Sequence, residues 1–125
     1  VEGELASQLN DSGAETLLTL DLLSGTVDKI LDQTKIKNLI VTSLADVYPP
    51  VAAPIKLLRK VPINKGEDFL SLLEEGSTDP INEEIDPKKD LVHLAYTGGT
   101  TGVSKGVMLT HFNVVANVLI RQLNI

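Results

Sequence analysis

Residues 14–44 read AETLLTLDLLSGTVDKILDQTKIKNLIVTSL and decide the fold class. The segments 14–22 and 38–44 are short and rich in Leu, Ile, Val and Thr, which is typical of buried strands. Between them, four residues recur at the spacing of one helix face: Val27, Ile30, Leu31 and Thr34. Strand, helix and strand within about 30 residues predict two parallel strands joined by a right-handed crossover. We therefore expect an α/β fold with a mostly parallel sheet flanked by helices.

Further elements are expected on both sides of this stretch. Leu5, Ala6 and Leu9 share one helix face, and Gly13 is a natural C-terminal cap. Four other segments have clear patterns. They are a short helix at 68–76, a strand at 90–97, a second strand at 106–110 that folds back beside it, and a closing helix capped by Thr110, with Asn113 three residues later. The closing helix has an apolar stripe of Val115, Val118 and Leu119 with Gln122, widened by Val114 and Leu123.

Two segments have more than one interpretation. Residues 48–62 contain four prolines, with Lys56, Arg59 and Lys60 next to apolar residues. This pattern suits a membrane-surface segment or a short surface helix whose long cationic side chains reach water. Residues 77–90 form an acidic connector with two prolines, whose carboxylates suit a metal or simply a solvated linker.

Composition excludes several classes of protein. The 125 residues include 11 basic and 17 acidic side chains, for a net charge of −6, and no basic stripe of the kind that nucleic acid requires. The absence of cysteine excludes disulfides, thiolate metal sites and a cysteine nucleophile. No apolar run reaches the roughly 18 residues of a membrane span, and the N-terminus does not resemble a signal peptide. We expect a cytoplasmic protein, with peripheral membrane contact left open.

The two ends of the sequence suggest a piece of a longer protein. The chain begins with Val1 and stops at RQLNI, inside a helical pattern. A parallel sheet that has lost its neighbours exposes its edges, so we also expect self-association through them.

The residues best suited to binding a ligand lie in the segment 96–111, YTGGTTGVSKGVMLTH. Glycines bring backbone N–H groups close to a ligand, and a turn of such groups binds anions. Three threonines, Thr97, Thr100 and Thr101, add hydroxyl donors, and Lys105 adds a positive charge. Open α/β sheets bind ligands at the carboxyl ends of their strands, where this loop is expected to lie. The loop is therefore a candidate phosphate-binding site, although a tight turn that binds nothing would also explain its glycines.

Two common phosphate-binding patterns do not fit. The P-loop requires Lys directly after Gly, whereas Lys105 follows Ser104. The dinucleotide fingerprint G-x-G-x-x-G is not formed by Gly98, Gly99 and Gly102.

The order of residues from Tyr96 to Val107, continued by Thr110-His111-Phe112-Asn113, resembles the phosphate-binding signature of the AMP-forming adenylating enzymes. The usual form of that signature has Ser where this chain has Gly98, and Pro where it has Ser104. Within the superfamily, the chain is most similar to the long-chain fatty acid–CoA ligases. The resemblance implies a fragment of the N-terminal AMP-binding domain, with residues 96–111 as the phosphate-binding loop and the strand that follows.

The resemblance also implies an activity and its ligands. Such enzymes join a carboxylic acid, here a fatty acid, to AMP from ATP with Mg²⁺, and then transfer the acyl group to coenzyme A. ATP phosphates would be bound by Thr97, Gly98, Gly99, Thr100, Thr101, Gly102 and Lys105, with Lys105 as the catalytic cation. Adenine, ribose and metal contacts lie downstream in these enzymes, so we expect this chain alone to be inactive. The alternative function is a stand-alone phosphate- or nucleotide-binding module without catalysis.

Three residues near the loop have competing interpretations. His111 could approach a ligand pocket but is expected to pack at the start of the closing helix. His93, in the middle of a strand, is expected to be an interior histidine. Tyr96 is expected to pack beside the loop rather than to take part in chemistry.

Overall fold

The computed structural model describes residues 2–47, 64–98 and 104–123. The chain divides into two compact units, Val1–Thr78 and Asp79–Ile125, which we treat separately. The proline-rich segment 48–62, with its two interpretations, lies outside the described residues.

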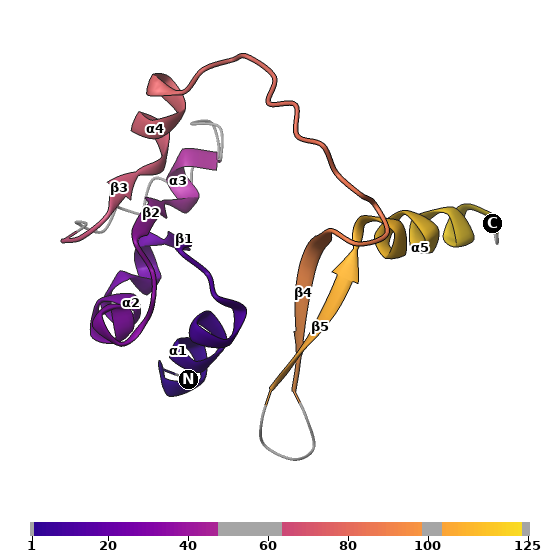
Figure 1. Cartoon of the computed structure of the whole chain (residues 1–125). Coiled ribbons are helices and arrows are strands. Elements are labelled where there is room, and N and C mark those ends of the chain that lie inside the picture. The colour runs from indigo at the N-terminus through magenta and orange to yellow at the C-terminus, as the bar shows by residue number, and fades with distance from the viewer. Residues whose placement is uncertain (1, 48–63, 99–103, 124–125) are drawn as a thin grey trace. The chain divides into compact units, whose positions relative to one another are not determined.

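The first unit is a helix-flanked sheet in which the expected order of elements is present (Figure 1). Its elements are α1 (Glu2–Ser12), β1 (Thr16–Leu20), the 3-10 turn η1 (Asp21–Leu23), α2 (Ser24–Ile30), the 3-10 turn η2 (Leu31–Gln33), β2 (Asn38–Thr42), α3 (Leu44–Val47), β3 (Glu67–Asp68) and α4 (Phe69–Glu75).

The sheet of the first unit is parallel, in the order β1-β2-β3. β1 and β2 pair in register from Thr16 opposite Asn38 to Leu20 opposite Thr42, which confirms the predicted strand–helix–strand unit. β3 was not expected. It is only two residues long and pairs with β2, with Ile40 opposite Glu67.

The core of the first unit lies between α2 and one face of this sheet. Val27 of α2 is 2% exposed and packs with Leu39 and Val41 of β2, while Leu17 and Leu31 border the cluster. Alternate residues of β2 point to this face because side chains alternate along a strand. On the other face of β1, Leu18 is half-exposed.

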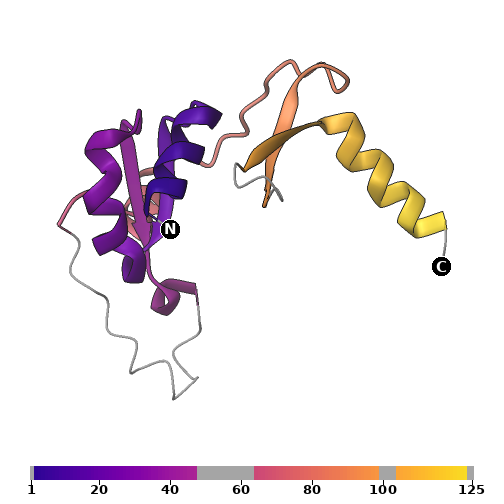
Figure 2. The same cartoon turned by 90° about the horizontal axis from the view of Figure 1, so that it is seen from below.

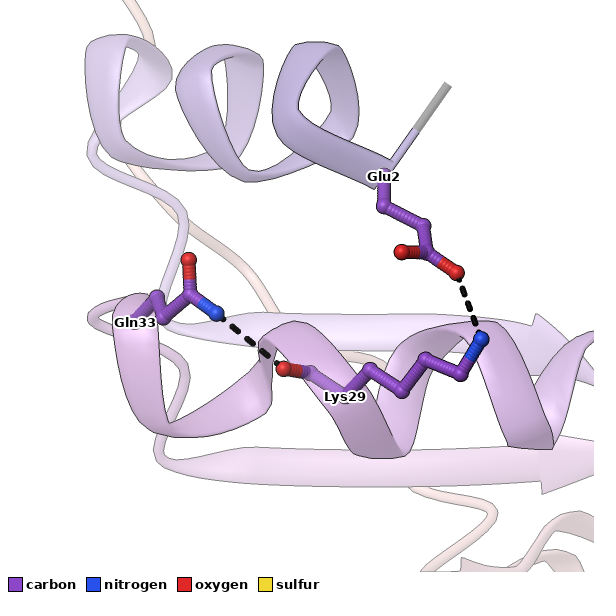
Figure 3. Close-up of polar contacts among 3 residues, drawn as sticks. All are labelled: Glu2, Lys29 and Gln33. Atoms are coloured by element: carbon purple, nitrogen blue, oxygen red, sulfur yellow. Dashed lines mark hydrogen bonds and ion pairs between the residues drawn. The ribbon is translucent and has the colours of Figure 1, made fainter.

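α1 and α2 lie side by side and are joined at their surface by polar contacts (Figures 2 and 3). The Lys29 ammonium lies 2.8 Å from Oε1 of Glu2 and donates a hydrogen bond to it. In the same patch, Nε2 of Gln33 donates to the backbone carbonyl of Lys29 at 3.1 Å. The hydrogen bond from Lys29, with its positive charge, lowers the pKa of the Glu2 carboxyl, and the same contact raises the pKa of Lys29.

Glycine is required at two positions in this unit. Gly13 has a φ of 68° and ends α1, as expected. Gly66 has a φ of 98°, and a Cβ there would lie 2.9 Å from both the backbone oxygen and Cγ of Leu39. Gly66 thus lets the chain approach β2 closely just before β3 begins.

The second unit consists of β4 (Leu91–Thr97), β5 (Lys105–Thr110) and α5 (His111–Leu123), drawn in orange to yellow in Figure 1. The two strands pair antiparallel, which confirms that the second folds back beside the first. Leu91 pairs with Thr110 and His93 with Leu109, so Val92 is an extra residue that forms a bulge in β4.

The structure defines the immediate setting of the loop. Among the described residues, β4 pairs with β5 in a sheet of two strands. The loop therefore joins the two strands of an antiparallel hairpin, as the predicted fold-back of 106–110 requires. Its place at the carboxyl end of a parallel strand stays a prediction.

The second unit buries little of its apolar surface by itself. None of its described residues is buried. Side chains along α5, such as Val115, Leu119 and Leu123, are more than half exposed. The expectation that His93 is an interior histidine was wrong, since its side chain is exposed and no element of this unit covers it.

The acidic connector, residues 77–90, is exposed throughout and contains no helix or strand, and residues 87–89 form a turn. In the parts of the chain that the structure describes, no helix has the length and apolarity needed to cross a membrane.

Candidate functional site

The candidate loop is held at the closed end of the β4–β5 hairpin. Thr97 and Lys105 are opposite each other in register and form the last pair before the loop. Paired positions of an antiparallel ladder point their side chains to the same face, so the Thr97 and Lys105 side chains start from neighbouring positions at one edge of the loop. Gly99, Thr100, Thr101 and Gly102, the central residues of the predicted site, lie outside the described residues.

Lys105 is available to an external anion. Its side chain is exposed, and no carboxylate of the described residues forms an ion pair with it. Across the hairpin, Gly98 has open space where a Cβ would be, with no atom within 4 Å. The described edge of the loop thus combines an unpaired cation with a backbone that a ligand can approach.

Tyr96 and Gly106 form the next register pair and support the loop from the opposite face. A Cβ at Gly106 would lie 3.1 Å from Cζ of the Tyr96 ring, so the ring packs directly over this glycine. This arrangement agrees with the expected packing role of Tyr96.

α5 begins with a reciprocal cap, which confirms the expected roles of Thr110 and Asn113. Oγ1 of Thr110 accepts from the backbone N–H of Asn113 at 3.3 Å, and Oδ1 of Asn113 accepts from the backbone N–H of Thr110 at 3.0 Å. The N–H groups of His111 and Phe112 donate to the carbonyls of Asp90 and Pro87. The first N–H groups of α5 are therefore used within the protein, and the anion site of this unit is at the loop instead.

The hairpin is closed at its other end by residues 86–90, which we call the base turn. The backbone N–H of Asp86 donates to Oδ2 of Asp90 at 2.8 Å, and Oδ1 of Asp86 accepts from the backbone N–H of Lys88 at 3.0 Å. The carbonyl of Asp86 accepts from the N–H of Asp90 at 2.8 Å. The Lys88 ammonium lies 5.8 Å from the centre of the Phe112 ring, at a distance suited to a cation–π contact.

A shallow hollow of about 330 Å³ lies between β5 and α5, lined by Leu109, Asn113, Val114, Asn117 and Val118. It shares no residue with the predicted site. Its lining mixes aliphatic side chains with two amides.

Metal binding has no support in the described parts of the chain. Within residues 2–47, 64–98 and 104–123, no three His, Asp or Glu side chains are grouped closely enough to hold a metal ion. The acidic connector therefore provides no metal cage there.

A scan of protein families matches residues 1–123 to "AMP-binding enzyme". The chain belongs to the AMP-binding enzyme family. The match covers both units, so the parallel sheet and the hairpin are parts of one family domain, and it confirms the family that the sequence around the loop resembles.

Relatives within the AMP-binding enzyme family identify the branch. The chain is 35% identical to a long-chain-fatty-acid–CoA ligase of Escherichia coli O6:H1 over 92% of its length, and 36% identical to that of Bacillus subtilis over 93%. A crystal structure of a long-chain-fatty-acid–CoA ligase from Archaeoglobus fulgidus superposes with a TM-score of 0.68 at 33% identity, over 94% of the chain. The chain spans about a fifth of these proteins, 22% of each bacterial ligase and 20% of the archaeal one.

Sequence reasoning found the two ends of the loop but missed the base turn. Thr97 and Lys105 were both predicted as site residues, but their pairing across the hairpin comes from the structure. The signal for the base turn was Asp86-Pro87-Lys88-Lys89-Asp90, since Asp followed by Pro favours a turn closed by the aspartate side chain.

Proposed function

We propose that this chain works as part of an ATP-dependent fatty acid–CoA ligase, in which residues 97–105 bind the ATP phosphates. The observation that carries the proposal is the register pair at the loop, where the exposed Lys105 is opposite Thr97 and has no ion-pair partner among the described residues. The membership of the chain in the AMP-binding enzyme family supports the same assignment.

Each described site residue has a distinct task in this reaction. The fatty acid carboxylate attacks the α-phosphorus of ATP, and pyrophosphate leaves with additional negative charge. Lys105 would offset that charge, and the Thr97 hydroxyl would donate to a phosphate oxygen. Stabilisation of charge that develops during the reaction is often the largest catalytic contribution. Gly98 would let a backbone N–H approach the phosphates, and Gly99, Thr100, Thr101 and Gly102 are proposed to complete the loop.

Other ligands of the reaction stay predictions. Coenzyme A would accept the acyl group from the adenylate. Mg²⁺ is expected on the phosphates themselves, but no three His, Asp or Glu side chains of the described residues are grouped to hold it, and we derive no step through it. A cytoplasmic location, with peripheral membrane contact through residues 48–62, stays a prediction, and so does the inactivity of the 125-residue chain by itself.

The test uses the complete gene product that carries this chain. Pyrophosphate release from ATP is measured across a panel of carboxylic acids of increasing chain length. Lys105→Ala and Thr101→Ala are compared with Lys35→Ala, which removes the same charge from an exposed lysine of the first unit. We expect both loop variants to lose about 100-fold or more in kcat/KM, as loss of a transition-state donor usually costs, and Lys35→Ala to lose nothing.

Two results would contradict the proposal. Acid-dependent release that persists in Lys105→Ala would remove the loop from the chemistry. A folded wild-type protein that binds ATP but releases no pyrophosphate with any acid would favour the phosphate-binding module without catalysis.

A further inference from the structure

The base turn, residues 86–90, holds both ends of the β4–β5 hairpin at once. It leads directly into β4 through Asp90, and it also accepts the first N–H groups of α5, which follows β5. The carbonyl of Pro87 accepts from the N–H of Phe112 at 2.8 Å, and the carbonyl of Asp90 accepts from the N–H of His111 at 3.4 Å. The start of one strand and the end of the other are therefore tied to the same five residues.

The loop at the opposite end does little to set the strand register. Two-residue turns fix the register of a hairpin, but seven residues, 98–104, join these strands. A hairpin with a long, glycine-rich connection can slip, and a slip of one residue moves every side chain of one strand to the other face. Lys105 would then leave the face that it shares with Thr97.

Two features at the base-turn end of the hairpin resist such a slip. One is the Val92 bulge, because the extra residue fits only one pairing of Leu91 and His93 with β5. The other is the base turn, in which Asp86 uses its carboxylate, its carbonyl and its N–H group together.

We propose that Asp86 is a positioning residue that sets the register of the hairpin, and so the pairing of Thr97 with Lys105, from the end opposite the loop. Its carboxylate accepts from Lys88 N–H, which orients the Pro87 carbonyl toward α5. Its ion pair with Lys89, at 3.2 Å, joins an exposed lysine to a half-exposed aspartate and contributes little. The importance of this register for catalysis rests on the proposed function, but the register itself does not.

Register can be measured directly, because the chain contains no native cysteine. In the double variant Ala95→Cys/Val107→Cys, the two thiols are opposite each other in the observed register. In Ala95→Cys/Met108→Cys, they are opposite each other only after a slip of one residue. Opposed positions of an antiparallel pair have Cα separations of about 4.5–5.5 Å, which a disulfide can bridge.

Each cysteine pair is placed in the 125-residue chain with Asp86 intact and with Asp86→Ala, and disulfide yield is measured under mild oxidation. With Asp86 intact, we expect the 95–107 bond to dominate. With Asp86→Ala, we expect the ratio of 95–107 to 95–108 yields to fall about tenfold, as expected for loss of one charge-assisted hydrogen bond.

Two further variants serve as controls. Asp86→Asn keeps an acceptor for Lys88 N–H and should restore the ratio. Glu83→Ala removes an exposed carboxylate from the same connector and should leave the ratio unchanged.

An unchanged ratio in Asp86→Ala would overturn the inference. Loss of both disulfides would also overturn it, because Asp86 would then only keep the unit folded. A parallel assay separates this inference from the proposed function. In the complete gene product, Asp86→Ala should raise the KM for ATP, and a shifted register with an unchanged KM would leave the positioning role intact while removing phosphate binding from the Thr97–Lys105 pair.

Discussion

Gly66 is the residue at which backbone conformation and packing both require the absence of a side chain. Its φ of 98° is costly for any residue with a Cβ, and that atom would lie 2.9 Å from a backbone oxygen of β2, which cannot move aside cheaply. We expect Gly66→Ala to lower the free energy of unfolding of the first unit by about 1–3 kcal/mol.

A matched substitution provides the control for this prediction. Gly25 lies in α2, with no atom within 4 Å of a built Cβ. Gly25→Ala should therefore stabilise the unit by about 0.5–1 kcal/mol through helix propensity. Denaturant midpoints of both variants test the pair, and equal shifts in the same direction would contradict the assignment.

The contact between Glu2 and Lys29 gives α1 a pH-dependent attachment to α2 (Figure 3). Because the hydrogen bond from Lys29 lowers the pKa of Glu2 below its usual 4.5, the stabilisation is present above that value and is lost as pH falls through the lowered pKa. The raised pKa of Lys29 sets the alkaline limit, since stabilisation is full below 10.5 and is lost as pH rises through the raised value. Both side chains are exposed, so the effect should be small.

A double-mutant cycle with Glu2→Gln and Lys29→Met isolates this contact from the rest of the protein. We expect a favourable coupling between the two substitutions in thermal unfolding near neutral pH, and none at about pH 2, where the carboxyl is protonated. Coupling that persists at the acid pH would show that the contact does not depend on the Glu2 charge.

At the scale of single elements, α5 depends on its N-terminal cap. Removing the Thr110 hydroxyl leaves the N–H of Asn113 without its acceptor and deprives Oδ1 of Asn113 of one donor. We expect Thr110→Ala to lower stability by about 1 kcal/mol, and Thr110→Ser to preserve it. Helix content and its thermal loss, measured by circular dichroism, distinguish the two. Equal behaviour of the Ala and Ser variants would contradict the capping role.

Elements with a regular spacing of apolar residues could be predicted from the sequence, and so could the return of the second hairpin strand beside the first, but the two-residue strand β3 could not. α1, β1, α2 and β2 follow from apolar spacing, and Gly13 ends α1 as a glycine cap should. β3 consists of Glu67 and Asp68, which carry no strand preference, and exists because β2 offers a free edge beside it. The sequence also did not indicate that β4 and β5 form a sheet of only two strands among the described residues.

The candidate site was predictable only in part, for a similar reason. The residue types of the loop and their order predicted a phosphate-binding site. The structure adds that β4 and β5 place Thr97 and Lys105 opposite each other. The exposure of His93 depends on which elements cover the hairpin. The base turn has a local signal, but its hydrogen bonds to the start of α5 join segments more than 20 residues apart in sequence, which local spacing does not predict.

At the scale of the whole molecule, the most important property is apolar surface left uncovered. Val115, Val118 and Leu119 of α5 are each half exposed or more, as is Leu18 of β1, an edge strand of its sheet. Exposed apolar side chains and unpaired strand edges favour association with another chain. We therefore expect the isolated 125-residue chain to self-associate as its concentration rises.

Sedimentation over a wide range of concentrations tests this prediction. Leu119→Lys should weaken association by placing a charge on the apolar face of α5. Asn117→Lys adds the same charge about 200° around the helix and should have a smaller effect. A wild-type chain that remains monomeric at every concentration would contradict the prediction.

The connector between the units has a practical consequence. Ile81 is 86% exposed, and Ile81 and Asn82 lie within a stretch without helix or strand, so new sequence inserted between them breaks no secondary-structure hydrogen bond. A short peptide tag or a fluorescent label can be introduced there without altering either the parallel sheet or the hairpin.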